Sequence, residues 1–383
     1  MRFPEFSGEW KEEQLDSIAT LSKGVGISKE QLSEVGEPCI LYGELYTKYK
    51  SEIIKQIESK TDIDCSKLKR SKANDVIIPC SGETAVDIAT ARCVPFDNIL
   101  FGGDLNVISL HKYDGAFMSY QLNGKRKYDI VRVAQGVSVV HLYGDHLKAI
   151  KTYNPTLPEQ QKIAKLLSLL DERIATQNKI IEDLNKLKSA IIEMEYTHKT
   201  KGNTHIGDFI EQTSKRNKDS AIQNVLSVSN SQGFIQQCEQ FENRSVASDD
   251  ISNYKIVERN CFAFNPARIN VGSIARLTTF NRGIVSPMYI CFRTKDNLFP
   301  EYLDYYFESK QFFTEIQKRL EGSVRQCLSY EGLCNIPLCI PTVEVQQQTG
   351  KRLSTLVQEI KLEIDFLELL QKQKKFLLHQ MFI

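Results

Sequence analysis

The sequence lacks the features that mark membrane-spanning, metal-binding and nucleotide-hydrolysing proteins. No apolar run approaches the roughly 20 residues that a membrane-spanning helix needs, and the opening stretch "MRFPEFSGEWKEEQLDS" is polar. The ten cysteines form no Cys-x-x-Cys pair and the six histidines do not cluster, which favours buried reduced thiols over a metal site. No Gly-x-x-x-x-Gly-Lys-Ser/Thr phosphate loop is present. These absences predict a cytoplasmic protein with no membrane segment.

The chain also has little net charge. Its 49 Lys and Arg residues nearly balance its 48 Asp and Glu residues, giving +1. Nucleic-acid-binding proteins usually carry a basic excess, so any DNA-binding groups must be gathered locally. At 383 residues, with 41% hydrophobic and 25% charged residues, the chain has an ordinary globular composition and room for two or three domains.

What the sequence does contain is a long-helix opening that occurs twice, 186 positions apart. The first copy, "PTLPEQQKIAKLLSLLDERI", starts at position 155, and the second, "PTVEVQQQTGKRLSTLVQEI", at position 341. Between 155–188 and 341–374, 13 of 34 positions are identical without a gap, which indicates an internal duplication. In both copies the apolar residues alternate steps of three and four, as in a coiled coil. The polar interruptions repeat too, because Gln177 and Lys188 correspond to Glu363 and Lys374.

The segments that precede the two helices correspond as well. "DVIIPCSGETAVDIATA" matches "NCFAFNPARINVGSIARL", and "RVAQGVSVVHLYGDHLKAI" matches "RLEGSVRQCLSYEGLCNI". Each segment alternates short β-branched strands, glycine turns and short helices. We therefore predict an α/β (α+β) chain with globules at 1–154 and 200–340 and long helices at 155–199 and 341–383. Each helix has one apolar seam, so we expect an antiparallel coiled coil with pseudo-two-fold symmetry and a globule at either end.

With these motifs the chain resembles the specificity subunit of type I restriction–modification enzymes, over essentially its whole length. The residues that match the family's helix opening are Pro158, Glu159, Gln160, Gln161, Ile163, Ala164, Leu170, Asp171 and Ile174. The second copy keeps Gln346 and Gln347 but has Val345, Thr349 and Gly350 where the pattern has Glu, Ile and Ala. At these three positions the second opening departs from the pattern, so the resemblance does not predict exactly symmetric partner binding.

The resemblance implies two target-recognition domains, each reading one half of a split, asymmetric site in double-stranded DNA. It implies that the helices space these domains and dock two methyltransferase subunits, with restriction subunits outside them. The chain itself would be non-catalytic, and S-adenosylmethionine, ATP and Mg would be held by the partner subunits. Independently of the resemblance, an uninterrupted helix of roughly 55 Å is longer than a duplex turn of about 34–36 Å. Such a helix would hold two DNA-reading domains more than one duplex turn apart.

Candidate DNA contacts are chosen by residue type. Basic runs would contact phosphates, and those runs contain Lys69, Arg70, Lys72, Lys125, Arg126, Lys127, Lys215 and Arg216. Base reading needs Arg, Asn, Gln, Ser or Thr on short loops, and the candidates are Ser81, Thr84, Ser138, Asn265, Arg268, Asn270, Arg276, Arg325 and Gln326. Two alternatives stay open, since a basic run can be a solvated loop and the two asparagines can form turns.

Partner contacts are expected on the outer faces of the helices. The candidates stand at the helix starts, namely Glu159, Gln160, Gln161, Gln346 and Gln347. Helix capping and solvation are the alternative roles of these residues.

Two other functions compete with DNA recognition. The near-zero net charge suits a coiled-coil scaffold whose globules bind proteins. An enzyme with an unrecognised site is disfavoured, because "FNPARI" at 264–269 lacks the second proline and the aromatic residue of an amino-methyltransferase motif. Sequence-specific DNA binding that weakens with salt would separate DNA recognition from the scaffold.

Overall fold

A computed structural model of the protein describes residues 2–197, 204–230, 232–237, 250–322 and 326–382. The chain divides into two compact units, each made of one globule and parts of both long helices. Unit 1 comprises residues 1–179 and 364–383, and unit 2 comprises residues 180–363. This division follows packing, whereas the predicted domain boundaries follow the order of the chain and stay a prediction. Each unit is described by itself.

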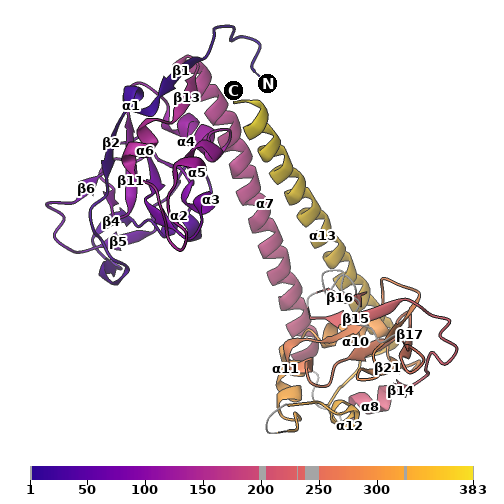
Figure 1. Ribbon diagram of the computed structural model, residues 1–383. Coiled ribbons are helices and arrows are strands. Elements are labelled where there is room, and N and C mark those ends of the chain that lie inside the picture. Colours follow the sequence, from indigo (N-terminus) through magenta and orange to yellow (C-terminus); the bar gives the residue numbers. More distant parts are fainter. Residues whose placement is uncertain (1, 198–203, 231, 238–249, 323–325, 383) are drawn as a thin grey trace. The chain divides into compact units, whose positions relative to one another are not determined.

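The two predicted long helices are present. Helix α7 spans Leu157–Thr197 and helix α13 spans Val343–Gln380 (Figure 1). The predicted seam positions are buried or half-buried, and they are Ile163, Leu167, Leu170, Ile174, Ile181, Leu184 and Ile191 on α7 and Leu353, Leu356, Ile360, Leu367, Leu370 and Leu377 on α13. The sequence periodicity therefore located the contact face of both helices correctly.

The paired helix segments of unit 1 run antiparallel. Near the start of α7, Ile163 and Leu167 pack against Met381 near the end of α13. Further along α7, Asp171 meets Lys374, so residue numbers fall along α13 as they rise along α7. In unit 2, Ile191 of α7 shares a core with residues of the first turns of α13.

The globule of unit 1 contains two main sheets and two short strand pairs. The four-stranded sheet has the order β2 (Ala19–Lys23), β11 (Leu105–Leu110), β7 (Asp75–Pro79), β9 (Arg92–Val94). The five-stranded sheet has the order β3 (Leu32–Ser33), β5 (Ser59–Thr61), β4 (Glu37–Ile40), β10 (Leu100–Phe101), β6 (Lys69–Arg70). The short pairs are β1 (Lys11–Gln14) with β13 (Lys151–Asn154), and β8 (Ser81–Gly82) with β12 (Val140–His141).

The globule of unit 2 contains two four-stranded sheets. The first has the order β14 (Ile210–Thr213), β21 (Ile290–Thr294), β18 (Phe262–Phe264), β19 (Ile274–Arg276). The second has the order β16 (Gly233–Gln236), β15 (Val225–Ser229), β20 (Arg282–Val285), β17 (Lys255–Glu258).

The two globules share the strand order of both sheets, apart from β3, which extends the second sheet of unit 1. The sheet β2-β11-β7-β9 of unit 1 and the sheet β14-β21-β18-β19 of unit 2 are both antiparallel. Their central strands, β11 and β7 in unit 1 and β21 and β18 in unit 2, correspond in chain position. The second sheets agree in a less common detail, because β4 pairs in parallel with β10 in unit 1 and β15 pairs in parallel with β20 in unit 2. On either side of that parallel pair, both sheets add an antiparallel strand. The internal duplication predicted from the helix openings thus extends to the fold of the globules.

Short helices connect the strands. In unit 1 they are α1 (Leu15–Ile18), η1 (Lys29–Gln31), α2 (Glu44–Thr47), α3 (Ala85–Ile88), α4 (Gly115–Asn123), α5 (Lys127–Val133) and α6 (Gly144–Lys148). In unit 2 they are α8 (Ile206–Phe209), η2 (Ile269–Val271), α10 (Pro300–Tyr306), α11 (Lys310–Gln317) and α12 (Tyr330–Cys334).

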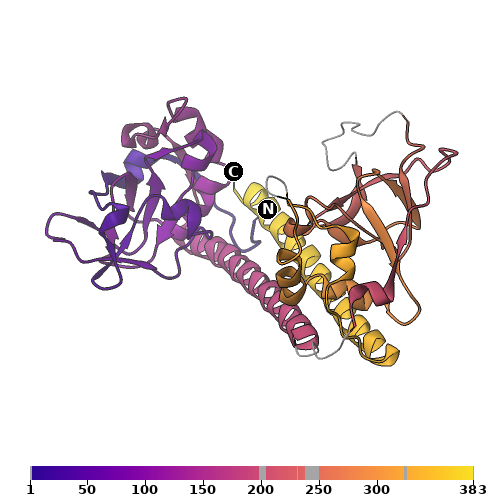
Figure 2. The ribbon, with the colours of Figure 1, turned by 90° about the horizontal axis from the view of Figure 1, so that it is seen from below.

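Helix α4 joins the sheet of unit 1 to the long helices (Figure 1; Figure 2). It begins at Asp114, whose carboxylate accepts a hydrogen bond from the N–H of Phe117 at 2.8 Å. Met118 packs on the core of the sheet, whereas Phe117 and Tyr120 pack against α7. Because both faces of α4 are covered, the position of the sheet on α7 is set by this helix.

No described helix has an apolar stretch long enough to cross a membrane. The nine cysteines among the described residues are free, and none is fully exposed. Within the described ranges, His, Cys, Asp and Glu side chains form no group that could hold a metal ion.

Candidate nucleic-acid interface

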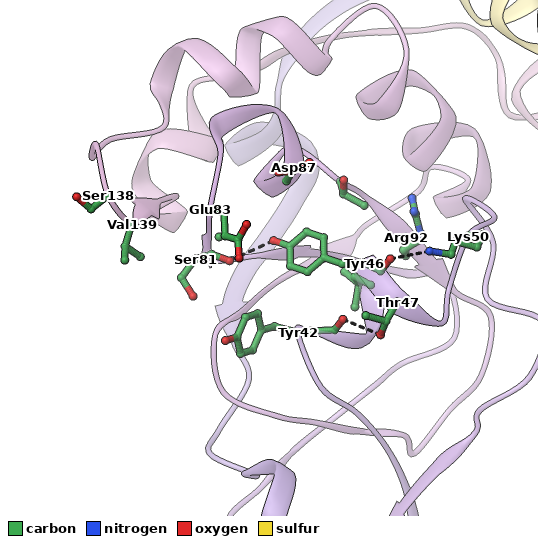
Figure 3. A pocket seen from close by; sticks show the side chains of 14 residues that line it. Tyr42, Tyr46, Thr47, Lys50, Ser81, Glu83, Asp87, Arg92, Ser138 and Val139 are labelled. Carbon is green, nitrogen blue, oxygen red and sulfur yellow. Dashed lines mark hydrogen bonds between the residues drawn. The ribbon is translucent and has the colours of Figure 1, made fainter. Parts of the chain in front are cut away.

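A pocket of about 730 Å³ opens on the globule of unit 1 (Figure 3). Its wall is formed by α2 and the residues around it, by the β8 segment and by the loop before β12, and the lining residues include Tyr42, Tyr46, Lys50, Ser81, Glu83, Asp87, Arg92, Ser138 and Val139. This set combines aromatic rings, hydroxyl groups and both signs of charge. Such a set can donate and accept hydrogen bonds at base edges and also contact apolar methyl groups.

Hydrogen bonds hold one wall of this pocket. The hydroxyl of Tyr46 donates to the backbone oxygen of Ser81 at 3.1 Å, and burial raises the pKa of that tyrosine far above its ordinary value. The ammonium group of Lys50 donates to the backbone oxygen of Tyr46 at 2.8 Å. Tyr46 is therefore a fixed neutral donor. The carboxylate of Glu83 remains on the rim, near Ser81 in Figure 3.

The loop at 135–141 forms the other side of the pocket. Its ends are closed by two backbone hydrogen bonds between Gln135 and His141, at 2.9 and 2.7 Å. Gly136 has a φ of +121°, and an added Cβ would lie 2.1 Å from the backbone oxygen of Val139, so the turn requires glycine. The tip is exposed, with Val137 96% accessible. An apolar tip of this kind is suited to contact the methyl group of thymine.

Unit 2 repeats the closure of this loop 186 positions later. Glu321 and Cys327 exchange backbone hydrogen bonds at 2.9 and 2.8 Å, and Gly322 has a φ of +105°. The predicted reader Arg325 lies outside the described residues, whereas Gln326 is described and exposed. The correspondence between the two loops, predicted from the sequence, therefore holds in the backbone.

Several predicted DNA contacts are engaged inside the protein. The guanidinium of Arg70 forms a two-pronged ion pair with Glu37. Arg276 is 11% accessible and binds Asp304 at 3.0 Å, and it donates a further bond to Asn260. For Arg276 these contacts correct the expected role as a base reader, because its largely buried guanidinium is held by carboxylates. Arg70 is paired at the surface, where 37% of its side chain is accessible, and its phosphate contact stays a prediction.

The basic run 125–127 is also largely internal. All three side chains are half-buried rather than exposed. The guanidinium of Arg126 lies 5.1 Å from the ring centre of Tyr153 and 3.2 Å from the carboxylate of Asp129. Burial lowers the pKa of Lys127. Arg126 therefore has a structural role in place of the expected phosphate contact, while the phosphate contacts of Lys125 and Lys127 stay predictions.

Two predicted base readers act as local structure formers. Thr84 caps helix α3, since its hydroxyl oxygen accepts from the N–H of Asp87 at 3.1 Å. Asn265 is buried, and its side-chain oxygen accepts from the N–H of Ala267 at 3.1 Å, so it forms a turn. Asn270 lies half-buried in η2. The turn-forming alternative is the correct one for Asn265.

The remaining DNA candidates are placed on accessible surface. Exposed side chains are those of Lys72, Ser138, Lys215, Arg216, Arg268 and Gln326, while Lys69 and Ser81 are half-buried. Lys215 and Arg216 line a basic pocket of unit 2. These residues remain predictions of DNA contact.

The first glutamine of the α7 opening has an internal role instead of the expected partner contact. The side-chain oxygen of Gln160 accepts from the N–H of Asp114 at 2.9 Å, and its amide donates to the backbone oxygen of Pro155 at 2.8 Å. It is 1% accessible. Gln160 thereby fastens the start of α4 to the start of α7. Its neighbour Gln161 is exposed and keeps the predicted partner role.

The α13 opening contains the same fastening in unit 2. The side-chain oxygen of Gln346 accepts from the N–H of Phe299 at 2.7 Å, and its amide donates to the backbone oxygen of Pro341 at 2.9 Å. Phe299 precedes α10, the counterpart of α4. Gln346 is fully buried, so it cannot contact a partner, whereas Gln347 is exposed. Gln160 and Gln346, the first of the two glutamines that both openings share, therefore join the globule to the long helix in each unit.

Glu159 is likewise buried, and the structure corrects its expected partner role. Its carboxylate oxygens accept from the guanidinium of Arg2, both at 2.6 Å, and from the indole N–H of Trp10 at 3.3 Å. The sequence pattern had identified a family position but not its function. The partner of this carboxylate lies 157 residues earlier in the chain.

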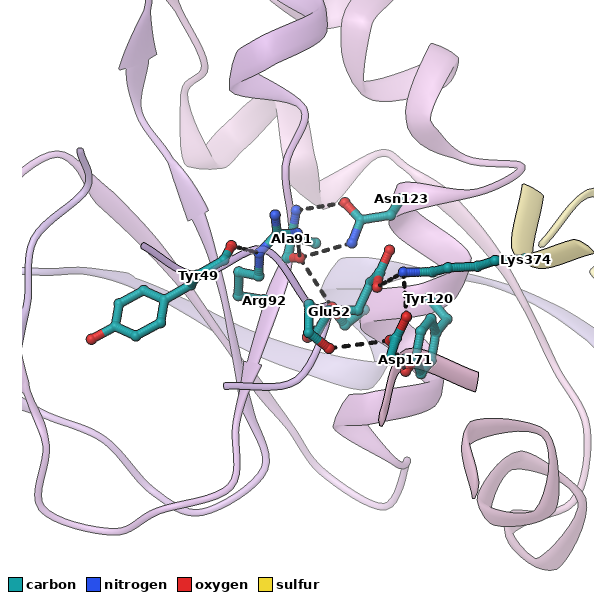
Figure 4. A network of polar contacts seen from close by, with 10 residues as sticks. Tyr49, Glu52, Ala91, Arg92, Tyr120, Asn123, Asp171 and Lys374 are labelled. Carbon is teal, nitrogen blue, oxygen red and sulfur yellow. Dashed lines mark hydrogen bonds and ion pairs between the residues drawn. The ribbon is translucent and has the colours of Figure 1, made fainter. Parts of the chain in front are cut away.

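A buried charge network fixes α13 in unit 1 (Figure 4). The ammonium group of Lys374 lies 2.5 Å from the carboxylate of Glu52 and 2.6 Å from that of Asp171. The hydroxyl of Tyr120 donates to the other oxygen of Asp171 at 2.6 Å. Burial raises the pKa of Glu52. For Lys374, burial acts to lower the pKa, but the two carboxylates outweigh it and the pKa is raised.

This network was not among the predicted functional residues. The polar interruption of the seam at Lys374 was the available signal, since a lysine in an apolar seam needs a partner. Its counterpart Lys188 in unit 2 meets the carboxylate of Glu308 at 2.6 Å. Both lysines lie over a tyrosine ring at equivalent positions of α4 and α10, with distances to the ring centre of 5.9 Å for Tyr120 and 5.8 Å for Tyr305.

Comparison with known proteins connects this geometry to a family. The type I restriction modification DNA specificity domain matches residues 7–186. This stretch belongs to the type I restriction–modification specificity family. The resemblance found in the helix openings is thereby confirmed.

A curated relative supports the assignment over a longer range. The MjaVIII type I restriction enzyme specificity subunit of Methanocaldococcus jannaschii is 24% identical over 337 residues, which cover 79% of this chain and 76% of the relative.

Two solved structures share the fold of a specificity subunit. The type I restriction–modification system S subunit of M. genitalium has a TM-score of 0.62 at 16% identity and covers 100% of this chain and 97% of its own. A chain from a study of complex assembly and conformational transition of the type I R-M system has a TM-score of 0.57 at 13% identity, covering 98% and 97%. At these identities the likeness concerns the fold alone.

Proposed function

We propose that the chain reads a bipartite, asymmetric site in double-stranded DNA and positions methyltransferase and restriction subunits on it, without catalysing a reaction itself. The observation that carries this proposal is the duplicated globule. Two units with a shared strand order have different residues at corresponding positions of the sequence, Val-Ser-Val at 137–139 and Ser-Val-Arg at 323–325. A duplicated scaffold with unlike loops suits two half-sites of different sequence.

The pocket rim of unit 1 supplies candidates for reading the first half-site. Ser138 lies at the exposed loop tip, and Ser81 and Glu83 lie on the facing segment. A serine hydroxyl can donate to or accept from a base, and a carboxylate accepts from the amino group of cytosine. We therefore add Glu83 to the candidate readers of unit 1, because the choice of Arg, Asn, Gln, Ser and Thr left out carboxylates.

The outer faces of the long helices support the docking of two methyltransferase subunits. In unit 1, Leu166 and Leu169 of α7 and Leu369 and Phe376 of α13 are exposed. Exposed apolar side chains that recur along helices mark interaction surfaces more often than isolated ones do. Restriction subunits would join outside the methyltransferases. S-adenosylmethionine, ATP and Mg would be bound by those partners.

The test is a genome-wide map of N6-methyladenine in the native host with and without this gene. We expect methylation of one split motif, two short half-sites with a fixed unread gap, to disappear with the gene. An unchanged map beside an active neighbouring methyltransferase would refute the role in DNA recognition. It would favour the scaffold with protein-binding globules, for which the net charge of +1 is the supporting observation.

A further inference from the structure

A basic pocket of about 810 Å³ lies on unit 2. It is formed by the segment after β14 and by the start of β20. Four of its nine lining residues are cationic, namely Lys215, Arg216, Lys218 and Arg282, and one, Asp219, is acidic. Positive charge is thus concentrated at one concavity of a chain whose net charge is only +1.

In the described part of the chain, no carboxylate neutralises these four cations. Within the described residues, none of them lies within ion-pair distance of an Asp or Glu side chain, and all four are exposed. Arg216 donates only to a neutral amide, that of Asn253, at 3.0 Å. By contrast, Arg293 pairs with Glu211 in the same unit. A cluster of unpaired cations around a hollow attracts an anion.

The loop that presents three of the cations is held rigidly from beneath. Asn217 is fully buried, and its N–H donates to the backbone oxygen of Tyr254 at 3.0 Å. Its side chain exchanges two further hydrogen bonds with the backbone of Ile222, at 2.9 and 3.1 Å. Because the loop is already ordered, binding an anion there costs less conformational entropy than ordering a mobile loop would.

The lining residues also indicate which part of a nucleic acid would enter. The lining contains no aromatic ring and no Asn or Gln side chain, so it offers neither a stacking surface nor a bidentate contact to adenine. Lysine and arginine side chains that are free of carboxylates bind phosphate oxygens. Their distribution over a loop and a neighbouring strand suits successive phosphates of a polymer.

We propose that this pocket binds consecutive backbone phosphates of the duplex beside the half-site of unit 2 and fixes the register of that unit without reading bases. The proposal rests on the proposed DNA-recognition function and extends it to a defined surface. Arg282, which stands alone in the sequence, and Lys218 become positioning residues together with Lys215.

The test compares two double variants of the full chain mixed with the host's methyltransferase subunit. In Lys218→Ala/Arg282→Ala, two pocket cations are removed, while Arg216 is kept because it bonds Asn253. The matched control Arg293→Ala/Lys295→Ala removes the same charge from the same unit. These two side chains already have internal partners, Glu211 for Arg293 and the backbone oxygens of Gly207 and Asp208 for Lys295. The affinity for DNA is measured at several salt concentrations. One synthetic duplex contains the split motif that the N6-methyladenine map identifies, and a second duplex lacks it.

We expect the pocket variant to lower the slope of log affinity against log salt by about 1.8, since each lost phosphate contact contributes about 0.9. The slope should fall by the same amount on both duplexes, and the control variant should keep the wild-type slope. The motif that is methylated in the presence of the pocket variant should be the same as with the wild type. An unchanged slope in the pocket variant, with wild-type selectivity for the motif intact, would overturn the pocket and leave the proposed function standing. A lowered slope without any selectivity in the wild type would support the pocket and overturn the function. A changed motif would show base reading and overturn the assignment to phosphates.

Discussion

Lys374→Met should destabilise unit 1 strongly. The substitution keeps the length of the side chain but removes the charge that faces Glu52 and Asp171, whose side chains are 9% and 5% accessible. Two neighbouring carboxylates would then remain buried without a cation. Removing one partner of a buried ion pair typically costs about 3–5 kcal/mol, and we expect a loss of stability in that range at pH 8.

The cost should also depend on pH, with a defined sign. Burial raises the pKa of Glu52, so the folded protein retains a proton there that the unfolded chain releases, and stability falls as pH rises through that interval. Lys374 acts against this by lowering the pKa of Glu52. Without the lysine the pKa of Glu52 rises further, and the fall in stability extends to higher pH. The difference between variant and wild type should therefore be small in acid and largest above neutrality.

Trp10 provides the assay. It is the one tryptophan of the sequence, and its ring lies 5.8 Å from Phe117 and 6.4 Å from Phe382 of the C-terminal segment. Its fluorescence during urea unfolding reports on unit 1. The matched control is Lys188→Met, whose partner Glu308 is 47% accessible. Exposed pairs contribute about 0–1 kcal/mol, so this variant should lose no more than that, measured by circular dichroism. A Lys374→Met variant that loses less than about 1 kcal/mol at pH 8 would refute the reasoning.

Three further outcomes are expected. Gln160→Ala should destabilise unit 1 by about 2–4 kcal/mol, because it leaves the N–H of Asp114 and the carbonyl oxygen of Pro155 without their partner. The control Gln161→Ala should change the stability by no more than about 0.5 kcal/mol. Equal effects of both variants in urea unfolding would contradict the role of Gln160 in joining α4 to α7. Phe382→Ala should cost about 3–5 kcal/mol and shift the fluorescence of Trp10, while Phe376→Ala on the exposed face should do neither. Arg325→Ala should relax or abolish recognition of one half-site in a methylation map, and equal loss at both half-sites would count against this residue as a reader.

The long helices and the duplication could be predicted because their signals are local. A heptad seam is written in residues three and four apart, and it predicted the buried face of both helices without knowledge of any partner. The strand order could not be predicted in the same way. β2 and β11, for example, pair over more than 80 positions, and many strands have only two to five residues, too few for a clear alternation.

The candidate site was predicted by residue type, and its errors come from distant partners. Arg276 is paired with a carboxylate 28 positions away, which a choice by residue type cannot detect. Glu52 and Lys374 are 322 positions apart. Arg282 was not predicted as a DNA contact, because it stands alone in the sequence. Only the fold brings it beside Lys215, Arg216 and Lys218. Family motifs located the buried joints, but motifs alone do not distinguish a contact within the chain from a contact with a partner.

The composition of unit 1 from residues 1–179 and 364–383 has a consequence for the order of folding during synthesis. Ile163, Leu167 and Phe117 share a core with Met381 and Phe382, so their apolar surface is left uncovered until the ribosome has made the whole of unit 2. Translation proceeds at about 5–20 residues per second, which leaves this surface open for on the order of ten seconds or more. Uncovered apolar surface of this kind favours aggregation of a nascent chain. Unit 2 is one continuous segment and can complete its folding first.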